Sequence, residues 1–158
     1  MPNWCSNMLN FEGGVNALNS FYIDWNESLK THEGFNPLVH KGFKTHEDCT
    51  GYFFDADELG KFDTSFDVSV QTKWGPLEVE LQDICKRYDL TCRCEYEESG
   101  MGLYGVLYVY LDRHEYKEFP YNEVIFSDND DDFSVKFRDK EYHSIFECVS
   151  CWIEDEGL

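Results

Sequence analysis

The chain has 158 residues, with 32 acidic residues against 13 basic ones and a formal net charge of −19 at pH 7. This length fits one domain that buries its own core, and the 17% aromatic content excludes an intrinsically disordered acidic chain. A surface this negative disfavours direct binding to nucleic acid or to an anionic membrane, and it favours a basic protein surface as partner.

The first half of the chain predicts one strand, one helix and one long connection. Apolar residues along 4–12 (WCSNMLNFE) indicate a strand, which two glycines end. From Val15 onward apolar residues recur at intervals of three and four, which predicts a helix over 14–30. Residues 31–63 have no stable period, so we expect a long connection with short local structure, of a kind that often carries function.

The middle of the chain has the clearest patterns. Residues 65–74 alternate apolar and polar side chains, as a half-buried strand does. After a Gly-Pro pair, residues 76–89 carry an apolar stripe with acids near the beginning and bases near the end, which predicts a helix. Two strands are expected over 90–99 and 102–113, joined by a Gly-Met-Gly hairpin turn.

The C-terminal part predicts two short strands and a helix. The strands are expected over 123–128 and 133–139, on either side of an acidic turn, and the helix over 143–153. The order strand, helix, strand, helix, strand, strand predicts an α+β fold. We expect a two-layer ferredoxin-like sandwich, a single domain over 1–158, whose antiparallel sheet has its helices on one face. The 31–63 connection and a C-terminal extension elaborate it.

Three short segments occur in a characteristic order: MPNWCSN (1–7), TKWGP (72–76) and YEESGMGLYG (96–105). Together they resemble the YubB-like family of phage- and plasmid-borne proteins, which is described as having a ferredoxin-like domain. The resemblance spans most of residues 1–113. It implies a mobile-element protein in a bacterial cytoplasm, and it implies no particular activity.

The motif residues have a structural and a functional interpretation. In the structural one, Trp4 and Trp74 lie on neighbouring strands, and Asn3 and Asn7 bond loose backbone groups through their side chains. In the functional one, Trp4, Trp74 and Tyr104 line a binding groove. The sequence leaves both open.

The cysteines and histidines are candidate metal ligands. Cys92 and Cys94, with the C-x-x-C pair at 148–151, could supply four thiolates to zinc, but both pairs fall on expected core faces. Seven cysteines without a recognisable secretion signal indicate reduced thiols in a cytoplasm. We therefore expect no metal and no cofactor. The alternative is a small-ligand or metal-dependent enzyme that uses the His/Cys-rich segment 32–49.

Clustered acidic residues are the most distinctive candidate site. Glu95 and Glu97 alternate with core residues on a predicted strand and should point outward. Such rows of carboxylates can imitate the phosphates of a duplex. The carboxylates expected to bind a partner are Asp55, Asp57, Glu58, Glu95, Glu97, Glu98, Asp128, Asp130, Asp131 and Asp132.

These observations favour a non-enzymatic, cytoplasmic mobile-element protein. We expect it to bind and block a basic nucleic-acid-binding site of a host protein, in an anti-defence role such as anti-CRISPR or anti-restriction. We expect neither direct nucleic-acid binding nor membrane binding. Three alternatives stay open besides the enzyme: an interaction subunit of a phage or plasmid machine, a homodimer, and a charge that serves solubility alone.

Overall fold

The computed structural model describes residues 3–29, 34–43, 51–129 and 132–158, without the side chains of 128–129 and 132–133. In chain order its elements are β1 (Trp4–Gly13), α1 (Val15–Ser28), α2 (Pro37–His40), β2 (Phe54–Lys61), β3 (Ser65–Lys73), α3 (Glu78–Tyr88), β4 (Leu90–Glu98), β5 (Leu103–Val109), β6 (His114–Glu118), a 3-10 turn η1 (Tyr121–Glu123), β7 (Ile125–Asn129), β8 (Asp132–Phe137), β9 (Lys140–Tyr142) and α4 (Ile145–Glu156).

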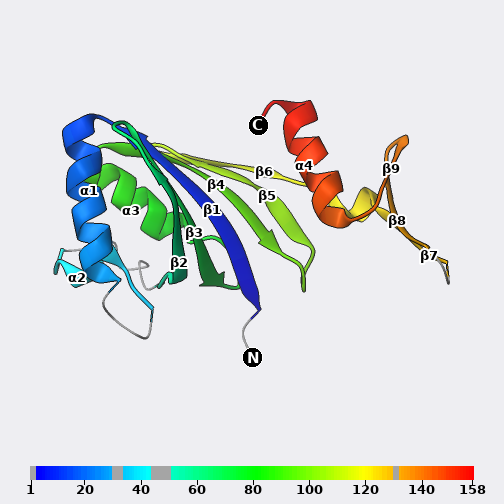
Figure 1. Cartoon of the computed structure of the whole chain (residues 1–158), viewed down its shortest axis with the longest axis horizontal. Coiled ribbons are helices and arrows are strands. Elements are labelled where there is room, and N and C mark those ends of the chain that lie inside the picture. The colour runs from blue at the N-terminus through cyan, green and yellow to red at the C-terminus, as the bar shows by residue number, and fades with distance from the viewer. Residues whose placement is uncertain (1–2, 30–33, 44–50, 130–131) are drawn as a thin grey trace.

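The main sheet of the described structure is antiparallel, with the strand order β2-β3-β1-β4-β5-β6 (Figure 1). The run β1-α1-β2-β3-α3-β4 is a complete ferredoxin-like β-α-β-β-α-β unit with β1 at its centre. Strands β5 and β6 extend the sheet beyond β4. The predicted α+β ferredoxin-like class is confirmed.

The segment 31–63, predicted as a long connection with short local structure, also holds a regular strand that was not predicted. It contains α2, which begins where the Asn36 side chain accepts bonds from Leu38 and Val39, and it contains β2, an edge strand. Strand β2 pairs with β3 through two register shifts and exposes most of its acidic sequence. Bulged and charged edge strands lack the alternation that reveals a half-buried strand.

The strand predicted over 102–113 is longer than the observed strand β5, and the strand that follows it, β6, was not predicted. Strand β5 ends at Val109, and the chain turns back through a hydrogen bond from Tyr110 N–H to the Arg113 carbonyl. All of β6 is exposed, so burial imposed no pattern on its sequence. The short strand β9 was missed for lack of length, since it has three residues.

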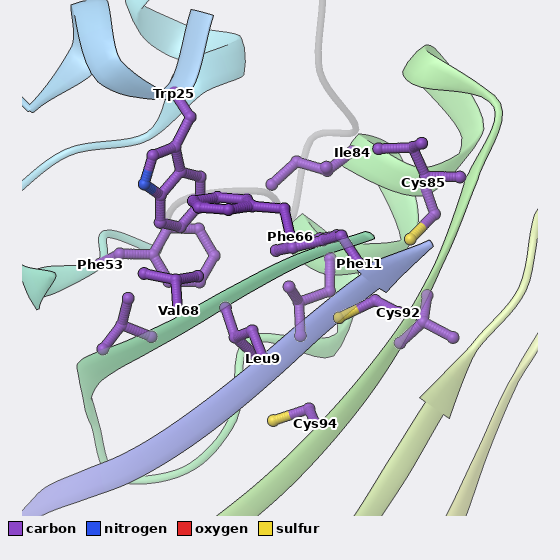
Figure 2. Packing of buried hydrophobic residues seen from close by; sticks show 14 of the residues in the cluster. Leu9, Phe11, Trp25, Phe53, Phe66, Val68, Ile84, Cys85, Cys92 and Cys94 are labelled. Carbon is purple, nitrogen blue, oxygen red and sulfur yellow. The ribbon is translucent and has the colours of Figure 1, made fainter. Parts of the chain in front are cut away.

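The main core lies between the sheet and the helices α1 and α3. Phe11 of β1, Phe66 of β3 and Trp25 of α1 pack on one another, and Cys85, Cys92 and Cys94 lie among these apolar residues (Figure 2). The expected positions of Cys92 and Cys94 in the core are confirmed. Aromatic side chains bury large apolar areas, so this cluster accounts for much of the hydrophobic stabilisation.

A second core joins the C-terminal extension to the sheet. It contains Tyr104 of β5, Phe119, and the α4 residues Cys148, Val149 and Trp152, together with residues of β8 and β9. Ser144 caps the N-terminus of helix α4, since its hydroxyl accepts a bond from Glu147 N–H. The helices α1 and α3 cover one face of the sheet as predicted, whereas α4 lies on the opposite side (Figure 1).

Candidate functional site

The first two sequence motifs meet through the buried side chain of Asn7. Its amide nitrogen donates to the Cys5 carbonyl at 2.9 Å and to the Thr72 hydroxyl at 2.8 Å, and that hydroxyl donates to the Gly75 carbonyl at 2.7 Å. The Asn7 side-chain oxygen faces the Cys94 thiol, with Sγ at 3.6 Å. The network satisfies buried polar groups, which fits the structural interpretation of these motifs.

The third motif reaches the same end of the sheet. Trp74 N–H donates to the Asn3 carbonyl at 2.9 Å, and the Asn3 side chain lies against Gly100 in the β4–β5 turn. Glu98 accepts bonds there from Gly100 N–H at 3.0 Å and Met101 N–H at 2.7 Å. Glu98 is only 2% exposed, so the expectation that it offers a surface carboxylate was wrong.

The two motif tryptophans are exposed. Trp4 is 46% and Trp74 55% accessible, and the Trp4 ring meets Phe54 edge-on at 5.1 Å between centroids. Lys73 lies over the Trp4 ring at 6.0 Å. Tyr104 is instead buried in the second core and stacks on Tyr121, so the predicted groove of Trp4, Trp74 and Tyr104 was wrong in that residue.

Most surface carboxylates of the sheet lie on the face that α1 and α3 leave uncovered. We call it the open face; it is formed by Ser6, Met8, Asn10 and the residues paired with them. Glu95 pairs with Met8 and Glu97 with Ser6, so both point to this face as predicted. Asp57 joins them through its pairing with Ser69, the neighbour of Met8 on β3.

The remaining predicted carboxylates are placed elsewhere. Glu58 lies opposite Val68 on the helix-covered side and accepts a 2.9 Å bond from the Tyr22 hydroxyl. Asp55 is exposed at the β2 bulge with a φ of 48°. Asp128 and Asp132 belong to β7 and β8, and their side chains lie outside the described part, as do Asp130 and Asp131 entirely. The structure therefore places Asp57, Glu95 and Glu97 on one face of the sheet, with β3 and β1 lying between Asp57 and the two glutamates.

The carboxylates of Glu95 and Glu97 have different surroundings. Glu95 forms an ion pair with Arg93, whose guanidinium also donates to the Leu158 carbonyl at 3.1 Å. Glu97 has no such partner in the described ranges 3–29, 34–43, 51–129 and 132–158. Partial burial disfavours its charged form and raises the pKa of its carboxyl above the ordinary value.

A groove that sequence reasoning missed lies between the open face and α4. It has a volume of about 230 Å³ and is lined by Met8, Glu95, Glu97, Phe146, Val149 and Ile153, among others. The helix supplies Phe146, Val149 and Ile153 at the three- and four-residue spacing of one helix face. This apolar stripe was the signal in the sequence that could have revealed the groove. It lies beside the stripe of Ile145, Cys148, Val149 and Trp152 that enters the second core.

The two cysteine pairs considered as zinc ligands lie in different cores. Cys92 and Cys94 lie in the main core, whereas Cys148 lies in the second core on the other side of the sheet. Burial raises the pKa of Cys5 and Cys85 to about 12 and that of Cys148 to about 11. Within the described residues no three His, Cys, Asp or Glu side chains group as a metal site would. Residues 32–33 and 44–49 of the 32–49 segment, which include His32, His46 and Cys49, lie outside them.

The order of the elements and the strand order of the sheet define an α+β protein of ferredoxin-like class. A family model described as the ferredoxin-like domain in Api92-like protein matches residues 51–141, more than half of the chain. The chain belongs to this family. No significant match was found among curated proteins or among solved structures. In the part of the chain that is described, no helix has the length and apolarity needed to cross a membrane.

Proposed function

We propose that this chain is a non-enzymatic binding protein of a phage or plasmid. It acts in the cytoplasm of a bacterial host and occupies a basic nucleic-acid-binding site on a host protein, which it thereby blocks in an anti-defence role. The observation that carries the proposal is the pair of carboxylates of Glu95 and Glu97, held on a rigid strand of a chain with net charge −19.

The scaffold supports mimicry by fixing the spacing of these charges. Glu95 and Glu97 are two residues apart on β4, so their Cα atoms are separated by about 7 Å. Strand β4 is an interior strand, paired with β1 on one side and β5 on the other. Charges placed on paired strands lose little conformational freedom on binding, whereas charges on a loose tail would have to be ordered.

The long-range field supports the choice of partner. A strongly negative protein is steered toward positively charged clefts, and the encounter slows as salt screens the charges. Nucleic-acid-binding sites are the common positively charged clefts of a cell, since they must neutralise phosphates. The mobile-element origin rests on the resemblance of the three motifs to YubB-like proteins, and blocking host defence is a function from which such an element gains.

The first test is capture of partners from bacterial lysate on the tagged protein, with elution in steps of increasing salt. The eluted proteins are identified by mass spectrometry and then tested for displacement from the tagged protein by duplex DNA and by RNA. The proposal predicts a nucleic-acid-binding protein that releases as salt rises and that nucleic acid displaces. A captured protein that binds this chain and nucleic acid at the same time contradicts the proposal.

A further inference from the structure

We propose that the groove between the open face and α4 receives a basic segment of the partner protein. The segment inserts an arginine or lysine side chain beside an aliphatic one. This inference rests on the proposed function and names the surface that contacts the partner.

The groove has a floor formed by strands and a wall formed by a helix, and the two differ in polarity. Its floor is the open face of β1, β3 and β4, where Ser6 and Ser69 are small and leave depth. Its wall is the α4 stripe of Phe146, Val149 and Ile153. The second core fixes the wall, because Trp152 and Cys148 on the other side of α4 are buried there. The groove is therefore preformed, as binding sites commonly are.

Two large apolar side chains that line the groove are about half exposed to solvent. Met8 on the floor is 52% exposed and Phe146 on the wall is 51% exposed, and both line the same hollow. Single exposed apolar residues are ordinary, but paired ones across a concave surface mark interaction sites. Methionine adapts its shape to different apolar partners, so Met8 suits an aliphatic side chain or the methylene stem of a basic one.

The charge of the groove selects a cation. Glu95 and Glu97 both line it, and no basic side chain is among its lining residues in the described structure. Arg93 neutralises Glu95 in part, whereas the Glu97 carboxylate has no hydrogen bond or ion pair in the described part. A guanidinium or ammonium group placed beside Glu97 would supply the missing counter-charge, and charge-assisted bonds of this kind are stronger than neutral ones.

The size and the net charge decide between occupants. The volume of about 230 Å³ is below the roughly 300–1,000 Å³ of typical small-molecule sites, so the groove suits one or two side chains. A second copy of this chain is disfavoured because each copy carries a charge of −19 and the open faces would repel. A basic peptide segment satisfies both the apolar wall and the carboxylates.

The test is a titration of the full chain with a fluorescein-labelled peptide of alternating leucine and arginine, followed by fluorescence anisotropy. The comparison peptide replaces each arginine by citrulline, which keeps the shape and removes the charge. The variant Glu95→Gln/Glu97→Gln is matched by Asp63→Asn/Asp139→Asn, which makes the same change in net charge at exposed turn positions away from the groove. Circular dichroism confirms that each variant is folded.

We expect the groove variant to bind the arginine peptide at least about tenfold more weakly, and the matched variant to bind like the wild type. The citrulline peptide should bind the wild-type protein more weakly than the arginine peptide by a similar factor. The methyl resonance of Met8 should shift on titration while that of Met101, exposed on the β4–β5 turn, stays in place. Equal losses in both variants, binding without a shift at Met8, or no binding to the wild type would each overturn the proposal.

The capture experiment separates this proposal from the one it rests on. If a Met8→Ser/Phe146→Ser variant, which keeps both carboxylates but loses the apolar sides of the groove, captures the salt-sensitive partner as strongly as the wild type, the groove proposal fails while the proposed function stands. If the wild type captures no nucleic-acid-binding protein but binds the peptide as expected, the proposed function fails and the groove remains a site for basic segments. A dimer by light scattering that the groove variant abolishes would show a second copy as the occupant instead.

Discussion

The Asn7 side-chain amide donates a 2.8 Å hydrogen bond to the Thr72 hydroxyl and so links two sequence motifs that are 65 residues apart. Both groups are buried at the end of the sheet where the third motif also arrives. These motif residues therefore maintain the fold at the junction of β1, β3 and β4. The exposed tryptophans beside them are the part of the motifs that this structural role does not explain.

Asn7→Ala should lower the free energy of unfolding by about 1–3 kcal/mol, since it leaves the buried Cys5 carbonyl and Thr72 hydroxyl without their donor. Urea denaturation followed by tryptophan fluorescence measures the change. Asn19→Ala, on the exposed side of α1, is the control and should change stability by less than about 0.5 kcal/mol. Equal stability of the Asn7 variant and the wild type would contradict the role of the network.

Gly105→Ala should destabilise the protein by about 1–3 kcal/mol through overpacking. A Cβ at Gly105 would approach the Lys117 carbonyl and the Tyr96 hydroxyl, which lie 2.6 Å or less from its ideal position. Gly75→Ala is the matched control because a Cβ there meets nothing within 4 Å. Thermal unfolding followed by circular dichroism compares the stability of the two variants. If the Gly105 variant were as stable as the Gly75 variant, β6 would have to move to accommodate the added methyl group without loss of stability, which would contradict the prediction.

The buried cysteines should resist alkylation in the native protein. Burial raises the pKa of Cys5 and Cys85 to about 12, so at pH 8 only about one thiol in ten thousand is a thiolate. Cys151 is only partly buried and should react first among the cysteines that the structure describes. Iodoacetamide labelling with peptide mapping by mass spectrometry resolves each site. Rapid native labelling of Cys92 or Cys94 would contradict their place in the main core.

Replacing Glu97 by glutamine should stabilise the protein at neutral pH. Burial raises the pKa of the folded carboxyl, so the folded state binds its proton more tightly than the unfolded state. The contribution of Glu97 to stability is therefore greatest at low pH and is lost as pH rises through the folded pKa. The denaturation midpoint of Glu97→Gln should exceed that of the wild type at pH 7, and the gap should narrow as pH falls toward about 4.3. If the difference in denaturation midpoint between the variant and the wild type widened as pH falls, the predicted upward direction of the Glu97 pKa shift would be contradicted.

The regular interior elements could be predicted from the sequence, and the edges could not. Strands β1, β3 and β4 bury one face, so their side chains alternate, and α1, α3 and α4 each carry an apolar stripe. The missed strands β2 and β6 lie at the two edges of the main sheet, where exposure removes that constraint. When β2 is added between α1 and β3, the predicted order of elements becomes the complete ferredoxin-like β-α-β-β-α-β unit.

The candidate site was predictable only as far as strand alternation reaches. Alternation correctly placed Glu95 and Glu97 outward, and it also puts Glu98 on the inward side with Cys94 and Tyr96. What alternation could not reveal is that the Glu98 carboxylate binds the backbone of the β4–β5 turn. Nor could alternation place Tyr104 in a second core, because that core depends on where α4 docks. The groove of Met8 and Phe146 joins residues far apart in the chain, and only the tertiary structure brings them together.

The most direct test of the central claim is a displacement titration with the captured partner. Labelled duplex, DNA or RNA according to the partner, is bound to the purified partner, and the protein is added in its wild-type form and as Asp57→Asn/Glu95→Gln/Glu97→Gln. The account predicts that the wild type displaces the duplex at one-to-one stoichiometry. The triple variant should need at least about tenfold more protein, since it lacks three carboxylates of the open face. Equal displacement by both forms, or a ternary complex with the duplex still bound, would contradict the claim.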